Sequence, residues 1–143
     1  MGDVKDVGRF SVEFAVANYR DILRLPPGEP VLENVKHIVV SGVVDSGAAR
    51  LVLPKHVADQ LQLPIDGETT VRYADHRQEK RARVSDVWIQ LKGRHGVFSA
   101  VIEPARNEAL IGAIVLEELD LLVDCTTQSL YPRDPDTIVT EIE

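Results

Sequence analysis

The chain has 143 residues, of which 44% are hydrophobic and 27% charged, so it is long enough for one domain with its own core and is not a wholly disordered chain. Its formal net charge of −7 argues against a general nucleic-acid binder. A single cysteine excludes an internal disulfide, and the lack of a signal-peptide pattern or a membrane-length apolar run predicts a soluble, cytoplasmic protein with no membrane partner.

The N-terminal third predicts two strands separated by a loop. Apolar residues alternate with polar or small ones across Phe10–Asn18, which is the period of a half-buried strand. Three prolines and a glycine in Leu25–Pro30 can continue neither a helix nor a strand, so this segment is a loop. The β-branched residues of Val35–Val44 predict the second strand, with a bend at Ser41-Gly42.

The middle of the chain predicts a short helix followed by a hairpin. A brief apolar strand, Arg50–Leu53, leads into Pro54–Leu61, where proline suits the first helical position and an i, i+4 apolar pair follows. Asp66-Gly67 predicts a turn. Thr69–Ala74 is then a strand, and Asp75–Arg77 is the tip of a hairpin.

The last part of the chain predicts several short strands and a second helix, Ala113–Leu119. The expected strands are Arg83–Leu91, Val97–Ile102, Leu121–Val123, Leu130-Tyr131 and, at the edge, Thr137–Ile142. Many short strands with two short helices predict a mostly-β, barrel-like fold. We expect one domain over residues 1–143, with its core at about 10–132 and a C-terminal tail or strand at 133–143.

Two segments of the chain point to chemistry. In Val43–Ala48, two β-branched residues carry Asp45 out of a strand and into the tight turn Asp45-Ser46-Gly47. Alone, this triplet is ordinary turn composition. Further along, Ala109–Gly112 repeats the pattern of an apolar strand that ends in glycine, and a short helix follows it at once.

Together the two segments resemble the retropepsin-like aspartic proteases, most closely the single-domain prokaryotic members. In that family an apolar–apolar–Asp–Thr/Ser–Gly–Ala loop is joined by a later apolar–apolar–Gly segment that crosses behind it. The likeness runs from roughly Val39 to Tyr131, most of the chain. It implies a small, closed, barrel-like fold, mostly β with two short helices, that acts as a homodimer.

The resemblance assigns roles to particular residues. Asp45 falls on the catalytic aspartate. The active loop would be supported by Ser46, Gly47 and Ala48, and the second motif would be Leu110, Ile111 and Gly112. The flap, which binds substrate, would include Tyr73, Ala74, Asp75 and His76. This tip lacks the usual glycines, and Ala49 and Ala113 stand where many retroviral members have aspartate and arginine.

The chemistry of the family needs two carboxylates that share a water. This chain has one Asp-Ser-Gly motif, so a two-fold axis would supply the second Asp45 from an identical chain. The expected function is that of an aspartic endopeptidase, which hydrolyses peptide bonds in a peptide or protein substrate with no metal or organic cofactor. Phe10–Asn18 and Thr137–Ile142 are candidates for the dimer sheet.

Two alternatives stay open. The altered flap tip favours a catalytically weak or inactive dimeric scaffold that binds peptides on the same fold. The basic patch Arg77–Arg83 could instead bind nucleic acid, although the net charge of −7 weighs against it and no nucleic-acid partner is predicted. The four histidines lack metal-ligand spacing, so no metal site is expected; they are His37, His56, His76 and His95.

Overall fold

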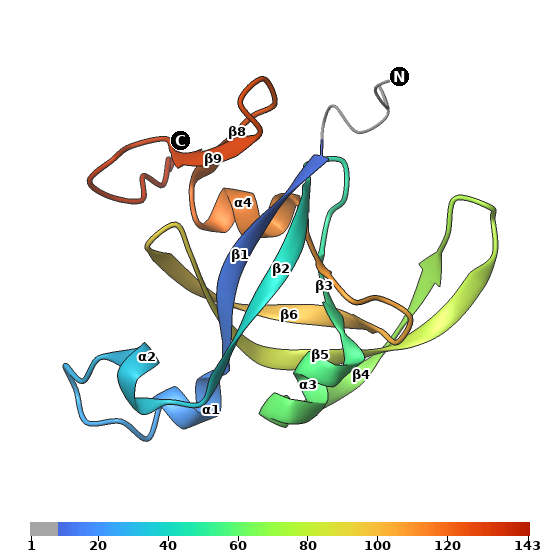
Figure 1. Cartoon of the computed structure of the whole chain (residues 1–143), viewed down its shortest axis with the longest axis horizontal. Coiled ribbons are helices and arrows are strands. Elements are labelled where there is room, and N and C mark those ends of the chain that lie inside the picture. Colours follow the sequence, from blue (N-terminus) through green and yellow to red (C-terminus); the bar gives the residue numbers. More distant parts are fainter. Residues whose placement is uncertain (1–8) are drawn as a thin grey trace.

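The structure is a computed structural model that describes residues 9–143. Strands account for 49% of the described residues and helices for 16%, which confirms the predicted mostly-β class. Figure 1 shows the strands crossing one another around a common interior, with a long hairpin projecting at the right. None of the helices in residues 9–143 is long and apolar enough to cross a membrane.

Six strands close into a barrel. In order around it they are β1 (Arg9–Asn18), β2 (His37–Asp45), β7 (Ala109–Ile111), β3 (Leu51–Pro54), β6 (Arg94–Glu103) and β5 (Gln78–Leu91). Antiparallel pairing of β1 with β5, where Asn18 lies opposite Val87, completes the ring. The strands outside the ring are β4 (Ile65–Arg72), β8 (Leu121–Asp124) and β9 (Ser129–Pro132). Of these, β4 extends β5 into the projecting hairpin, and β8 pairs with β9.

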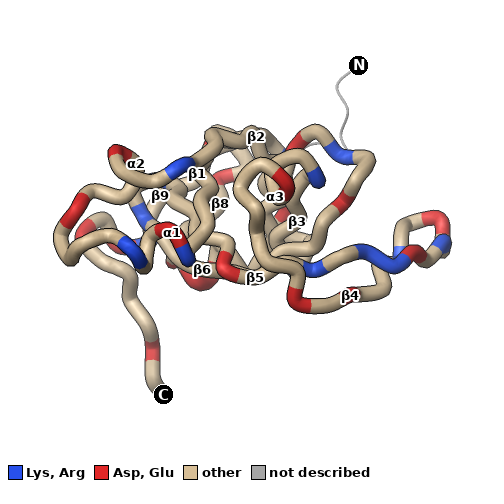
Figure 2. The backbone as a smooth tube through the Cα atoms, turned by 90° about the horizontal axis from the view of Figure 1, so that it is seen from below, with Lys and Arg blue, Asp and Glu red and all other residues tan. Residues whose placement is uncertain are grey.

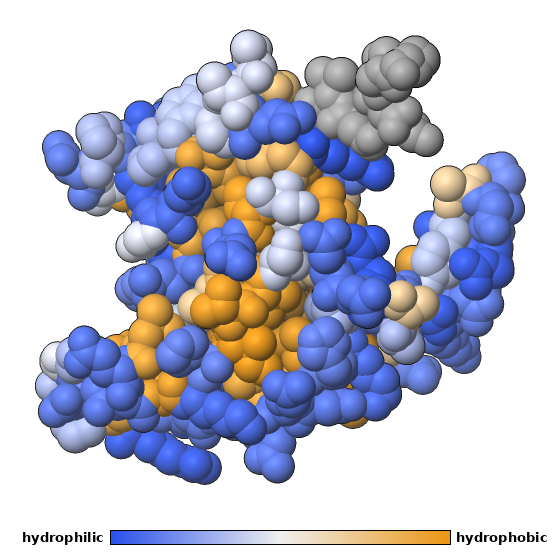
Figure 3. Space-filling view, viewed as in Figure 1, coloured by the Kyte–Doolittle hydropathy of each residue, from blue (hydrophilic) through white to orange (hydrophobic). Residues whose placement is uncertain are grey.

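The barrel interior is filled by aliphatic side chains. Those less than 2% exposed include Val16, Val44, Leu51, Leu53, Ile89 and Ile111. Because side chains alternate along a strand, β3 points Leu51 and Leu53 into the core and leaves Val52 half-buried on its other face. The space-filling view shows apolar residues over the middle of the molecule and polar residues around them, with a hollow between the body and the projecting hairpin (Figure 3).

The sequence predicts two of the four helices in the described residues, α3 (Lys55–Leu61) and α4 (Ala113–Glu118). The structure adds α1 (Tyr19–Ile22) and α2 (Val31–Asn34), each a single turn. Four residues are too few to show a helical period. The start of α1 is fixed instead by Asn18, whose Oδ1 accepts a hydrogen bond from the backbone N–H of Arg20 at 2.9 Å.

Two glycine-containing segments are strands where the sequence predicts a turn or a bend. Asp66-Gly67 lies inside β4, at a bulge where the φ of Gly67 is +146°, a conformation that glycine adopts freely. Ser41-Gly42 lies inside β2. A Cβ on Gly42 would come within 2.8 Å of the Phe14 ring, so this glycine makes room for a core side chain rather than for a bend.

The predicted edge strand Thr137–Ile142 is wrong, because this segment forms no strand. Its backbone is bonded to side chains instead. The Val139 N–H donates to Oδ2 of Asp120 at 3.0 Å, and the Val139 carbonyl accepts from Arg133 at 3.0 Å. Arg94 donates to the carbonyl of Thr137 at 2.9 Å. The alternating pattern therefore reflects packing of a tail on the body of the domain, not strand pairing.

Candidate active site

Asp45 is the last residue of β2 and begins a tight turn. Its Oδ1 accepts a hydrogen bond from the Gly47 N–H at 3.0 Å, and its carbonyl accepts one from the Ala48 N–H at 3.1 Å. Its other oxygen, Oδ2, lies 3.1 Å from Nη2 of Arg9, which stands directly opposite Asp45 in the β1–β2 register. The Asp45 side chain is 18% exposed. The carboxylate is therefore held from two sides and still reachable.

The second motif lies beside this loop. Strand β7 runs parallel to β2, with Leu110 opposite Val43 and Ile111 opposite Val44. Gly112 then passes against the loop backbone so closely that a Cβ would lie 2.5 Å from the carbonyl oxygen of Arg50. Only glycine permits this approach without displacing the loop.

The first amides of α4 hold the same loop. The N–H of Ala113 donates to the Ala48 carbonyl at 2.8 Å, and the N–H of Ile114 donates to the Ala49 carbonyl at 3.0 Å. These donors are among those that a helix start leaves unpaired. The structure thus brings Asp45, Gly47 and Ala48 together with the second motif, as a loop fixed on both sides.

The projecting hairpin of β4 and β5 ends in a compact tip. The Tyr73 N–H donates to the Arg77 carbonyl, and the His76 N–H donates to the Tyr73 carbonyl, both at 2.9 Å. Oδ1 of Asp75 accepts from the Arg77 N–H at 3.0 Å, and His76 has a positive φ of 70°. Ala74, Asp75 and His76 are exposed at this tip. Side-chain bonding thus replaces the glycines that such tips usually carry.

The base of the tip is tied to the barrel by Tyr73, Glu103 and Arg81. The Tyr73 hydroxyl donates to Oε2 of Glu103 at 2.5 Å, and Nε of Arg81 donates to Oε1 of Glu103 at 3.0 Å. Glu103 is only 8% exposed. Its hydrogen bond, followed by burial, raises the pKa of Tyr73 above 10.0, which keeps the hydroxyl protonated as a donor.

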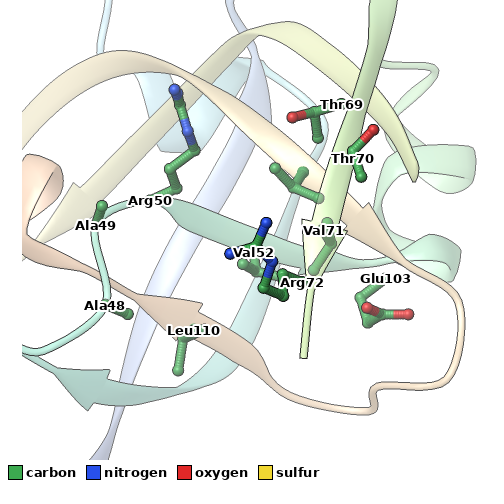
Figure 4. Close-up of a pocket in the computed structure, with 11 residues that line it drawn as sticks. Ala48, Ala49, Arg50, Val52, Thr69, Thr70, Val71, Arg72, Glu103 and Leu110 are labelled. Atoms are coloured by element: carbon green, nitrogen blue, oxygen red, sulfur yellow. The ribbon is translucent and has the colours of Figure 1, made fainter. Parts of the chain in front are cut away.

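Two adjoining cavities lie between this hairpin and the loop, with volumes of about 470 and 380 Å³. They share Val52, Val71, Glu103 and Leu110, so we treat them as one groove. Ala48, Ala49 and Arg50 line the end of the groove at the active loop, and Tyr73 lines the other end. Figure 4 shows β4, with Thr69 to Arg72, along one side and the loop along the other.

Some contributors to the site carry no signal in the sequence. Arg9 faces Asp45 because of the β1–β2 register, and Glu103 meets Tyr73 because β6 passes under the hairpin. Neither relationship can be read from a local pattern. Within the described part of the chain, no group of three or more His, Cys, Asp or Glu side chains is placed to hold a metal ion.

The comparison with protein families adds an independent observation. The sequence model of the family described as aspartyl protease matches residues 34–115, more than half of the chain. The match contains both the Asp45 loop and the second motif. The chain belongs to the aspartyl protease family. This confirms the retropepsin-like resemblance found in the sequence and supports a protease function. No curated protein matches the chain.

In this aspartyl protease domain, the groove adjoins the Asp45 loop. It begins at Ala48, three residues after Asp45, and runs beneath β4. Asp45 itself lies at the end of the groove and does not line it.

Proposed function

We propose that this chain is an aspartic endopeptidase that hydrolyses peptide bonds with a water held between Asp45 of two identical subunits. The observation that carries the proposal is the placement of Asp45. Its carboxylate emerges from a buried strand into a loop that Gly112 and the start of α4 hold rigidly, at the end of an open groove. Rigid placement of reacting groups is what the chemistry requires.

The mechanism divides two roles between two carboxylates. The ionised one removes a proton from the water, whose oxygen attacks the carbonyl carbon, while the protonated one donates to the carbonyl oxygen. As the tetrahedral intermediate collapses, the C–N bond breaks, the amine nitrogen takes the proton that the first carboxylate removed from the water, and a hydroxyl of the intermediate returns a proton to the second carboxylate. Two carboxylates about 3 Å apart cannot both be ionised, so the pair holds the single proton that this division needs.

The second carboxylate would come from a second copy of the chain. Within residues 9–143, Asp45 bonds to a cation and a backbone amide, and to no other carboxylate. Ser46 supports the same arrangement. It is exposed at the loop, and its hydroxyl makes no hydrogen bond within the described residues, so it is available to the partner loop.

The test is cleavage of a diverse, unstructured peptide mixture from about pH 4 to pH 7, the range that a carboxylate dyad suggests. Asp45→Asn keeps the size of the side chain and an oxygen that can accept from Gly47, but removes the carboxylate. Asp59→Asn, at an exposed position on α3, is the matched control. We expect cleavage to disappear in the first variant and to persist in the second.

The same experiment decides the scaffold alternative. A confirmed wild-type dimer that binds peptides and cuts none of them would contradict the enzyme and favour a peptide-binding module. The tip built from Asp75, His76 and Arg77 is the observation on which that alternative rests. Cleavage by Asp45→Asn at the wild-type rate would refute the assigned catalytic residue.

A further inference from the structure

The floor of the groove is apolar. Val52 and Leu110 come from neighbouring strands of the barrel, and Val71 and Val101 complete the lining from β4 and β6. Figure 4 shows Val52 and Val71 between the loop and Glu103. Such a floor accommodates the aliphatic part of a peptide, but it does not by itself select one sequence over another.

The charged residues around this floor are almost all of one sign. Glu103 is the one acidic residue among the lining residues. The basic ones are Arg50, Arg72, Arg77, Arg81 and Arg106. Figure 2 shows basic residues gathered along the projecting hairpin. In a chain with a net charge of −7, this local excess of positive charge stands out.

Some of these charges are already compensated. Arg81 pairs with Glu103, and the same carboxylate accepts the Tyr73 hydroxyl, so the negative charge of Glu103 is fully engaged. Arg77 lies within 3.8 Å of Asp75 and 3.6 Å of Glu79, and it covers the face of the Tyr73 ring at 4.3 Å. These contacts build the groove and leave little for a ligand.

Three arginines keep an uncompensated charge. Arg50 and Arg72 form no ion pair with residues 9–143. Arg106 donates from Nε to the carbonyl of Glu108 at 3.0 Å, which orients it without neutralising it. Arg72 lines the cavity next to the active loop, and Arg106 lines the adjoining one. A guanidinium of this kind binds carboxylates through paired hydrogen bonds.

We propose that the groove selects polypeptide substrates with an aspartate or glutamate beside an aliphatic residue, and that Arg72 and Arg106 are the residues that recognise the acidic side chain. The proposal rests on the proposed function and names its substrate class. The aliphatic side chain lies on Val52 and Leu110, and the carboxylate reaches the arginines at the rim. A positive groove in an acidic protein also favours the approach of acidic segments over that of basic ones.

The features of the groove favour a peptide over a single-stranded nucleic acid. Binding of bases relies on aromatic side chains that are free to stack. Tyr73 is the one aromatic residue in the lining, and Arg77 already covers its ring. The net charge of −7 would repel a chain of phosphates outside the groove.

The test uses three short peptides that are identical except at one position beside a leucine, where they carry glutamate, glutamine or lysine. We expect kcat/KM for the glutamate peptide to exceed that for the glutamine peptide about tenfold, with the lysine peptide lowest. Arg72→Gln and Arg106→Gln should each reduce this ratio. Arg24→Gln, at an exposed arginine beyond α1, is the control and should leave the ratio unchanged. Equal rates with the glutamate and glutamine peptides in the wild type would overturn the proposal.

A binding measurement separates this inference from the enzyme itself. The same peptides, fluorescently labelled, are titrated with the Asp45→Asn dimer and followed by anisotropy. If nothing is cleaved, a preference for glutamate that is lost in Arg72→Gln still supports the recognition. A short single-stranded RNA that binds more tightly than the glutamate peptide, and whose binding is also lost in Arg72→Gln, would assign the groove to nucleic acid and overturn it.

Discussion

The guanidinium of Arg9 lies 3.1 Å from the carboxylate of Asp45, at the first and last register positions of two neighbouring strands. The Arg9 side chain is 58% exposed, so this ion pair should contribute less than about 1 kcal/mol to stability. Its effect on the orientation of Asp45 is more consequential. The first strand of the chain thereby reaches directly into the proposed catalytic loop.

Arg9→Gln should reduce activity more than stability. Without the cation, the Asp45 carboxylate loses one of the two contacts that orient it. We expect kcat/KM to fall about tenfold. The free energy of unfolding measured by urea denaturation should change by less than about 1 kcal/mol. Lys55→Gln, which breaks an exposed ion pair with Asp59 on α3, is the control for both measurements. A fall in activity no larger than that of the control would contradict the prediction.

Gly112→Ala should damage both the fold and the loop. The new Cβ would meet the backbone of Arg50 at 2.5 Å, and backbone cannot move aside as a flexible side chain can. We expect a loss of about 2–4 kcal/mol in the free energy of unfolding, together with loss of cleavage. Gly28→Ala is the comparison, since nothing lies within 4 Å of its Cβ and its φ of +87° alone costs about 1 kcal/mol.

Ser46→Ala should weaken the proposed dimer. The serine hydroxyl is exposed at the loop and bonds to nothing within residues 9–143. Its removal should therefore leave the stability of the chain nearly unchanged and raise the dimer dissociation constant about tenfold. Sedimentation over a concentration series measures this constant. Ser46→Thr retains the hydroxyl and should dimerise as the wild type does; equal dimerisation of all three would remove Ser46 from the interface.

Tyr73→Phe should show a loss of stability that depends on pH. The phenol is the donor that Glu103 holds, so its removal costs about 1 kcal/mol at neutral pH. Because the pKa of Tyr73 is raised in the fold, the wild type has this advantage below about pH 10. The advantage disappears as the pH rises through the folded-state pKa. Denaturation curves at neutral and alkaline pH test this, and a difference that does not depend on pH would refute it.

Asp120→Asn should release the C-terminal tail and change how the free energy of unfolding falls at acid pH. The Val139 N–H, followed by Arg133, lowers the pKa of Asp120 below 3.8. This carboxylate therefore stabilises the fold above the pKa of the unfolded chain, and the contribution is lost as the pH falls through the lower folded-state value. We expect faster amide exchange at Val139 in the variant. We also expect the free energy of unfolding to decrease less steeply in the variant than in the wild type as the pH is lowered. Unchanged exchange at Val139 would contradict the assignment.

The sequence predicts the strands of this chain where one face of the strand is buried. Alternation predicts β1 and the barrel part of β5, Arg83–Leu91, and the apolar run before Asp45 predicts β2. The closure of the barrel cannot be predicted from the sequence, because the pairing of Asn18 with Val87 joins segments far apart in the chain. Asp66-Gly67 shows that a local pattern can also mislead. Its composition is that of a turn, yet the strand continues through it as a bulge.

The proposed site divides in the same way. The Asp45 loop and the Leu110–Gly112 motif carry local signatures, so the sequence indicates both before their contact is seen. Arg9 and Glu103 carry none, since their importance comes from register and from a strand crossing. The tail after Asp136 misleads for a related reason. Its alternation suits a strand, but side chains of Asp120 and Arg133 take up its backbone groups.

The length of β5 has a consequence for how a substrate enters and leaves. The strand runs from Gln78 in the projecting hairpin to Leu91 in the barrel wall, with a register shift between Val84 and Val87 and a positive φ of 57° at Asp86. The hairpin therefore has no loop hinge at its base on this side. Any movement of the hairpin over the groove would bend a continuous strand at this irregularity, a collective motion on the microsecond-to-millisecond scale. Turnover would then be set by the stiffness of a single strand, and substitutions at Asp86, far from the carboxylates, would change it.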